Sequence, residues 1–190
     1  MRHGNLFVIS GPSGTGKGTL VSRLGELVPD LWVSVSATTR QPRAGEVDGV
    51  QYFFKTEDEF MQLAEADGFL EWARYDGNCY GTPRASVEEH IAKGEQVILE
   101  IDVQGGFQIR EKVPGAVLIF VEPPSLEELE RRLRNRATES EEVIASRLEA
   151  AKVELSRKME YDKRLVNDNL ESALAELAAI INEQAETPRG

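Results

Sequence analysis

The chain is poor in cysteine, in cations and in long apolar runs, and each shortage excludes a class of protein. Its single cysteine, Cys79, rules out an internal disulfide framework and fits a reducing compartment. No apolar run is long enough to span a bilayer and no signal-type start is present, so we expect a soluble, cytoplasmic protein with no membrane partner. The formal net charge of −11 repels a nucleic-acid backbone, and no basic tail offsets it. Nucleic acid is therefore not an expected partner.

What the chain does contain suits one compact globular unit. Its 190 residues are 41% apolar and 29% charged, which is enough for a real core and too little for a second large domain. Short apolar runs alternate with amphipathic stretches, a pattern typical of an α/β fold. The runs expected to form a mostly parallel sheet are residues 6–9, 97–102, 117–121 and the less apolar 163–166.

Helices are expected between these strands. The first is predicted to run from a glycine-rich loop to Val28, because Pro29 stops it. Start signals of the later helices are Thr82-Pro83, Ser125 with Glu128, Thr138 with Glu141, and Asp168 with Glu171. Two stretches interrupt the alternation where an open sheet carries functional loops: residues 34–80 are turn-rich and β-like, and residues 126–157 are helical and highly charged.

The segment "SGPSGTGKGT", Ser10 to Thr19, predicts a phosphate-binding loop between a strand and a helix. Its glycines let backbone N–H groups surround an anion, and Lys17 can bridge the outer phosphates. Gly18 stands where most such loops carry Ser or Thr, so we do not expect a hydroxyl there to hold magnesium. The predicted ATP contacts are Gly11, Pro12, Ser13, Gly14, Thr15, Gly16, Lys17, Gly18 and Thr19.

A second group of anion-binding candidates lies in the turn-rich stretch. Arg40 and Arg43 occur in "TTRQPRAGEVDGVQYFF", near the hydroxyl of Tyr52. Two phosphate sites indicate two nucleotides. The alternative of a switch GTPase weakens, because Asp102 and Gly105 supply its Asp-x-x-Gly form but no Asn-Lys-x-Asp base-reading motif follows.

These motifs, in this order, resemble a guanylate kinase of the bacterial, nucleotide-converting type. The resemblance covers nearly the whole chain, from "ISGPSGTGKGT" through "FLEWARYDGNCYGTP", "VILEIDVQGG" and "PPSLEELERRLRNRATESEEVIASRL" to "VNDNL". It implies a P-loop NTPase three-layer α/β fold forming a single domain over residues 1–190. Its parts would be a core (1–33, 84–125 and 158–190), a small β-rich GMP-binding subdomain (34–83) and a helical lid (126–157). It also implies transfer of the γ-phosphoryl group of ATP to GMP, with Mg²⁺ required.

The resemblance also assigns a GMP site. Arg40, Arg43, Tyr52 and Tyr80 would hold the phosphate, and Ser36, Glu71, Thr82 and Asp102 would read the base. Carboxylates suit guanine, which presents N1–H and a 2-amino group as donors, whereas adenine presents an acceptor at N1. Glu71 alone would by default be an exposed strand residue. Asp102 ends a buried strand, so base contact and water-mediated support of the metal both stay open.

The remaining cations of the site come from the charged stretch. Phosphoryl transfer needs positioning and cations around the migrating group, without a covalent nucleophile. Lys17, Arg132, Arg136 and Arg147 match the family's residues for this role, and Asn167 in "VNDN" would lie near the base of ATP. No protein side chain is assigned as a direct metal ligand.

Two alternatives to a GMP kinase stay open from the sequence. A non-catalytic, guanylate-kinase-like protein-binding module would bind peptides, but such modules have damaged phosphate loops, whereas Lys17 is intact here. The second alternative is a kinase of another nucleoside monophosphate, and Glu71 and Asp102 argue against it. The sequence leaves open monomer or homodimer, and GMP or dGMP.

Overall fold

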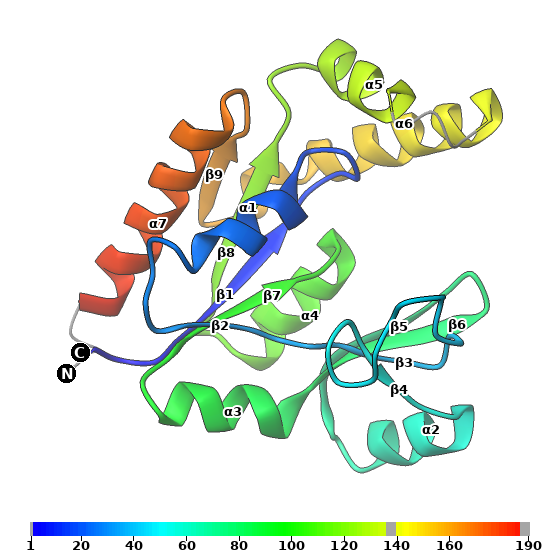
Figure 1. Ribbon diagram of the computed structural model, residues 1–190, viewed down its shortest axis with the longest axis vertical. Coiled ribbons are helices and arrows are strands. Elements are labelled where there is room, and N and C mark those ends of the chain that lie inside the picture. Colours follow the sequence, from blue (N-terminus) through cyan, green and yellow to red (C-terminus); the bar gives the residue numbers. More distant parts are fainter. Residues whose placement is uncertain (1, 136–139, 187–190) are drawn as a thin grey trace.

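The computed structural model describes residues 2–135 and 140–186, and a five-stranded sheet forms their centre (Figure 1). Its strand order is β2-β7-β1-β8-β9, and every pair of neighbours is parallel. The strands are β1 (Asn5–Ser10), β2 (Leu31–Val33), β7 (Gln96–Glu100), β8 (Val117–Glu122) and β9 (Lys163–Val166). All four predicted core strands are thus confirmed. Residues 31–33 were not expected to be a strand, because three residues are too few to show a pattern.

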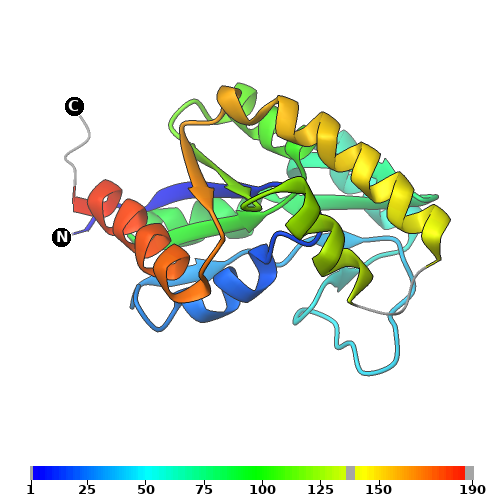
Figure 2. The same ribbon diagram turned by 90° about the horizontal axis from the view of Figure 1, so that it is seen from above.

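Helices cover both faces of this sheet, which gives the predicted three layers (Figures 1 and 2). Buried residues of α1 (Lys17–Leu24) and α7 (Leu170–Glu186) pack on one face, including Leu20 and Leu177. Residues of α3 (Arg84–Ala92) and α4 (Val103–Lys112), including Val87 and Ile109, pack on the other. Because the sheet is buried on both sides, its strands read as continuous apolar runs.

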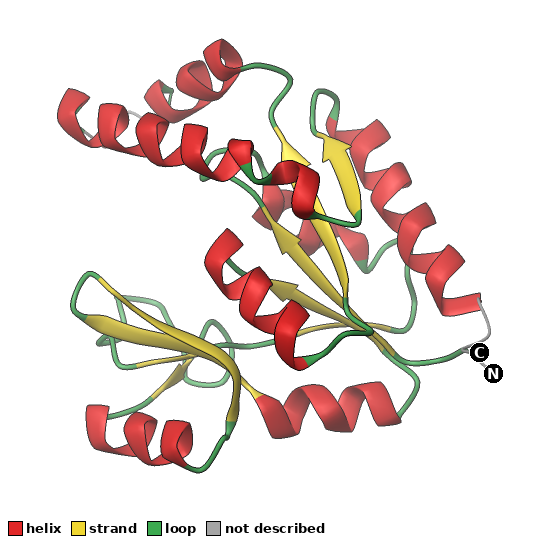
Figure 3. Ribbon diagram, turned by 180° about the vertical axis from the view of Figure 1, so that it is seen from behind, coloured by secondary structure: helices red, strands yellow, loops and turns green. Residues whose placement is uncertain are grey.

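A second, four-stranded sheet lies beside the core in the order β4-β3-β6-β5 (Figure 3). Its strands are β3 (Ala37–Thr38), β4 (Phe53–Phe54), β5 (Phe69–Tyr75) and β6 (Asn78–Pro83). Strands β5 and β6 form an antiparallel hairpin, and α2 (Glu57–Glu65) packs Phe60 against Phe69. This unit has its own small core around Phe60, Phe69 and Cys79.

Two further helices project from the core on the same side as the second sheet (Figure 1). They are α5 (Leu126–Arg134) and α6 (Glu141–Ser156), and a 3₁₀ turn, η1 (Lys158–Glu160), leads back to β9. Leu129 and Leu133 of α5 pack against Ile144 and Ala151 of α6. No helix in the described part of the chain is long and apolar enough to cross a membrane.

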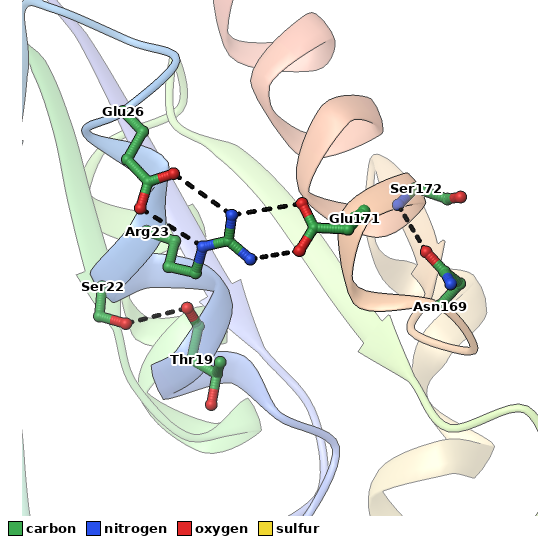
Figure 4. Close-up of polar contacts among 7 residues, drawn as sticks. All are labelled: Thr19, Ser22, Arg23, Glu26, Asn169, Glu171 and Ser172. Carbon is green, nitrogen blue, oxygen red and sulfur yellow. Dashed lines mark hydrogen bonds and ion pairs between the residues drawn. The ribbon is translucent and has the colours of Figure 1, made fainter.

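The predicted helix ends are only partly confirmed. Ser125 caps α5 by accepting a bond from the N–H of Glu128, as predicted. The prediction for α7 is wrong by one residue, because the side chain of Asn169, not Asp168, accepts from the N–H of Ser172 (Figure 4). The first helix ends at Leu24, four residues before Val28.

Two other start signals also differ. The Thr82-Pro83 signal lies inside β6, so α3 begins only at Arg84. Ser140 caps α6 through the N–H of Val143, while Thr138 lies outside the described residues.

Candidate active site

The glycine-rich loop joins the carboxyl end of β1 directly to the start of α1. The N–H and the hydroxyl of Thr15 both donate to the carbonyl of Pro12, at 3.3 and 2.9 Å, and fold the loop on itself. Gly16 has φ of 87°, and a Cβ there would lie 2.6 Å from Nδ2 of Asn167, so only glycine fits. Lys17 bends back over the loop and donates to the carbonyls of Gly11 and Pro12, at 2.5 and 3.0 Å.

Asn167, directly after β9, braces this loop through a side-chain hydrogen bond. Its Nδ2 donates to the carbonyl of Thr15 at 2.8 Å, and the residue is only 5% exposed. Its own carbonyl accepts from Nη2 of Arg132 at 3.0 Å. The loop, the end of β9 and α5 therefore meet at one asparagine. Sequence reasoning placed Asn167 near the nucleotide but missed this role, since nothing in "VNDN" shows which backbone group an amide will bind.

Of the three predicted arginines, Arg147 contacts the loop directly and Arg132 reaches Asn167, which contacts the loop. The guanidinium of Arg132 donates from Nη2 to the carbonyl of Asn167 and from Nε to Oε1 of Glu128, the latter at 2.8 Å. Hydrogen bonds from Arg131 and Arg132 hold the pKa of Glu128 at about 2. Arg147 of α6 donates to Oγ of Ser13 at 3.3 Å. Arg136 lies outside the described residues.

Glu71 of β5 and Thr82 of β6 form a buried polar pair, although a strand glutamate is usually exposed. Glu71 is 6% exposed, and the hydroxyl of Thr82 donates to its Oε1 at 2.7 Å. Burial raises the pKa of Glu71 to about 6, the charge of Asp102 adds to this effect, and the Thr82 bond opposes it. Asp102 caps α4, and its Oδ1 accepts from the N–H of Gly105 at 2.7 Å.

A cavity of about 330 Å³ brings most of the predicted GMP residues together. The predicted residues in its lining are Ser36, Tyr52, Glu71, Tyr80 and Asp102. Thr82 stands behind Glu71, through the hydrogen bond between them. With Glu100 also in the lining, the walls combine aromatic rings with three carboxylates, which suits a flat, donor-rich ligand.

Arg40 lies beside this cavity in a fixed orientation. Its Nη1 and Nη2 donate to the two carboxylate oxygens of Glu46, at 3.0 and 2.9 Å, and lower the pKa of that carboxyl. The guanidinium lies 5.4 Å from the ring centroid of Tyr52, which meets the Tyr80 ring edge-on. Glu46 also accepts a hydrogen bond from the backbone N–H of Arg43. Arg43 itself is exposed. Sequence reasoning missed Glu46, although an acid three residues after an arginine in a turn is a usable signal.

A second cavity, of about 500 Å³, adjoins the first. It is lined by the loop residues Gly11, Ser13 and Lys17 together with Arg147 of α6. Glu100 and Asp102, at the end of β7, line both cavities. The two predicted anion-binding regions therefore meet at the carboxyl edge of the core sheet, where open α/β sheets bind their ligands.

The side chains at this edge can support a magnesium ion without enclosing it. No group of three acidic, histidine or cysteine side chains suited to a metal occurs among residues 2–135 and 140–186. Glu100 lies close to Gly18, with its Oε1 3.6 Å from where a Cβ would stand, and it lines a cavity with Thr19. Desolvation raises the pKa of Glu100, and Lys17 opposes this. Oxygen donors of this kind fit Mg²⁺, which takes most of its ligands from phosphates and water.

Comparison with known proteins gives one consistent result. The family model described as "Guanylate kinase" matches residues 3–184. A guanylate kinase of Synechococcus sp. (strain CC9311) is 54% identical over 175 residues, which are 92% of each chain. The crystal structure of guanylate kinase from Anaplasma phagocytophilum is 33% identical with a TM-score of 0.78, covering 98% of this chain and 88% of that one. A shikimate kinase from Bacteroides thetaiotaomicron, at 15% identity and a TM-score of 0.53 over 94% and 98% of the two chains, shares the fold.

Proposed function

The chain belongs to the guanylate kinase family, and from this premise we propose that the two adjoining cavities are its GMP and ATP sites. The enzyme is an ATP:GMP phosphotransferase: it transfers the γ-phosphoryl group of ATP to GMP and yields ADP and GDP. We further propose that it accepts dGMP, that it acts in the cytoplasm, and that it serves purine nucleotide metabolism by recycling GMP.

The smaller cavity receives GMP in this proposal. Arg40, Arg43, Tyr52 and Tyr80 hold its phosphate, and Arg40 is held in place by Glu46. The base-reading residues are Ser36, Glu71, Thr82 and Asp102. The ionised carboxylate of Glu71 accepts from N1–H and the 2-amino group of guanine. Adenine offers that buried carboxylate no N1–H donor, and such mismatches cost on the order of 10⁴-fold in a well-sealed site.

The larger cavity receives the phosphates of ATP. Backbone N–H groups of residues 11–19 and the side chain of Lys17 hold them, and Lys17, Arg132, Arg136 and Arg147 stabilise charge on the migrating group. An oxygen of the GMP phosphate attacks the γ-phosphorus as the bond to ADP breaks. Mg²⁺ would supply further charge neutralisation at the phosphates, with Asp102 supporting it through water. Asn167 would lie near the adenine base while bracing the loop.

The division of the chain into a core, a GMP-binding subdomain and a lid follows from the same assignment. We take residues 34–83, with the second sheet, as the GMP-binding subdomain. Residues 126–157, with α5 and α6, form the lid over ATP. The core then comprises residues 1–33, 84–125 and 158–190. Arg147 on α6 already contacts Ser13 of the loop, which supports the lid assignment.

One observation carries the proposal: a buried glutamate and Asp102 share a cavity that adjoins the Lys17 loop. The test measures ADP formation from ATP and Mg²⁺ with GMP, dGMP, AMP, UMP or CMP as acceptor. We expect turnover with the guanine nucleotides only, loss of turnover in Lys17→Met, and weaker discrimination against AMP in Glu71→Ala.

Lys93→Met is the matched control, because Lys93 lies on α3's end and pairs with Glu89 away from both cavities. It should keep wild-type turnover. Nucleotide binding without turnover on any acceptor would instead favour a non-catalytic binding module, and turnover with another monophosphate would favour a kinase of that nucleotide.

A further inference from the structure

Tyr75 is a large aromatic residue that lies at both cavities and has no role in the site described above. It is the last residue of β5, and 74% of it is exposed. It lines the smaller cavity with Glu71 and Tyr80, and the larger one with Lys17 and Arg147.

The strand explains why the ring points this way. Alternate residues of a strand share a face, so Glu71, Ala73 and Tyr75 lie in a row, and all three line the smaller cavity. The pairing of Tyr75 with Asn78 places it next to the turn of the β5–β6 hairpin, at the tip that lies farthest along the strand from Phe69. Its side chain is therefore the outermost of the row that begins at the base-reading carboxylate.

Helix α6 forms the facing wall of the larger cavity. Arg147, Ala150, Ala151 and Glu154 line it, and their spacing of three and four residues puts them on one helix face. The two alanines leave room opposite the ring. The hairpin and α6 project from the same end of the core (Figures 1 and 3), and the larger cavity has Tyr75 of the hairpin and Arg147 of α6 in its lining, together with Lys17.

We propose that Tyr75 is a positioning residue of phosphoryl transfer that walls off the bound nucleotides from water. This inference rests on the proposed function. In the productive reaction, a GMP phosphate oxygen forms the new bond to the γ-phosphorus and ADP leaves. In the competing reaction, water forms that bond, loses a proton to solvent, and yields inorganic phosphate and ADP. The ring keeps the second reaction slow by occupying the opening shared by the two cavities.

The test measures GDP, ADP and inorganic phosphate in one reaction mixture. Wild type should form one GDP for each ADP. Tyr75→Ala should release inorganic phosphate, lower the GDP-to-ADP ratio, and lower kcat/KM for GMP about tenfold, because the acceptor is held less well. Tyr75→Phe should keep the wild-type ratio, since the ring rather than the hydroxyl forms the wall.

Met159→Ala is the matched control: Met159 is 71% exposed but lies in η1 and lines neither cavity. It should match wild type in every product. A Tyr75→Ala enzyme with an unchanged product ratio overturns the inference, whatever its kcat. If that variant does not fold, Tyr75→Leu decides by the same ratio. Absence of GDP formation by wild type would instead overturn the proposed function itself.

Discussion

Glu71 shows what a single residue's sequence context can and cannot reveal. Its position in a strand predicts an exposed carboxylate, and only the resemblance to a family suggested otherwise. The structure buries it beside Thr82, a partner eleven residues away that comes opposite only because β5 and β6 pair. The pairing register, and with it the raised pKa, arises from tertiary contacts that no local pattern contains.

Burial of this carboxylate should destabilise the free enzyme above neutral pH. Folding raises the pKa of Glu71 from 4.5 to about 6, so the contribution of Glu71 to the free energy of unfolding is most favourable below pH 4.5 and is lost as pH rises through 6. The loss at pH 8 is about 2 kcal/mol. We therefore expect Glu71→Gln to unfold at higher urea concentration than wild type at pH 8, and at a similar concentration near pH 4.5. Equal midpoints at pH 8 would contradict this.

Glu46 should matter for GMP although it carries a charge of the same sign as the phosphate. Its bidentate bond orients Arg40, and a neutral amide cannot accept both guanidinium donors equally. We expect Glu46→Gln to raise KM for GMP about tenfold with little change in kcat or in KM for ATP. Glu57→Gln is the control, because Glu57 pairs with the exposed Arg74. Tighter GMP binding in Glu46→Gln would show that Glu46 competes with the phosphate instead.

At the scale of elements, the sequence predicts the core better than the inserted parts. Continuous apolar runs mark β1, β7 and β8 because both faces of the sheet are buried. Strands β3 and β4 have two residues each and exist only through their partners, so no periodicity could reveal them. Helix ends depend on which of two neighbouring side chains reaches a backbone N–H, as Asn169 and Asp168 illustrate.

The brace between β9 and the phosphate loop gives a test at this scale. In Asn167→Ala the carbonyl of Thr15 loses its buried hydrogen-bond donor, and the backbone of Gly16 loses the amide group that packs beside it. We expect KM for ATP to rise about tenfold, because a loosened loop holds the phosphates less well. Steady-state kinetics with varied ATP at saturating GMP would measure this.

Asn169→Ala, two residues away, is the control for that variant. It removes the cap of α7 and should lower the free energy of unfolding by about 1 kcal/mol without changing KM for ATP. Equal effects of the two variants on KM for ATP would contradict a specific brace.

For the whole molecule, the net negative charge opposes the binding of anions, while the fold brings cations together at one site. A chain of net charge −11 binds two anionic nucleotides, so its cations must be gathered locally. Lys17 of α1 and Arg147 of α6 contact the loop, and Arg132 of α5 bonds Asn167, which contacts the loop in turn. The motifs and their order in the sequence predicted which residues belong to the two nucleotide sites. The sequence could not give the distances between those residues, because these depend on how the inserted units are placed on the core.

That placement predicts a strong response to a ligand that fills both cavities. Glu100 and Asp102 line both, so a compound that joins adenosine and guanosine through a polyphosphate chain should occupy them together. Linking turns the second contact into an intramolecular step with an effective concentration on the order of millimolar. In a thermal unfolding assay at equal concentrations, this compound should raise Tm more than ATP and GMP added together. The matching compound with two adenosines should raise the Tm of wild type less. In Glu71→Ala, the difference between the Tm shifts caused by the two compounds should be smaller than in wild type. A shift no larger than that of ATP alone would mean that the cavities do not bind one continuous ligand.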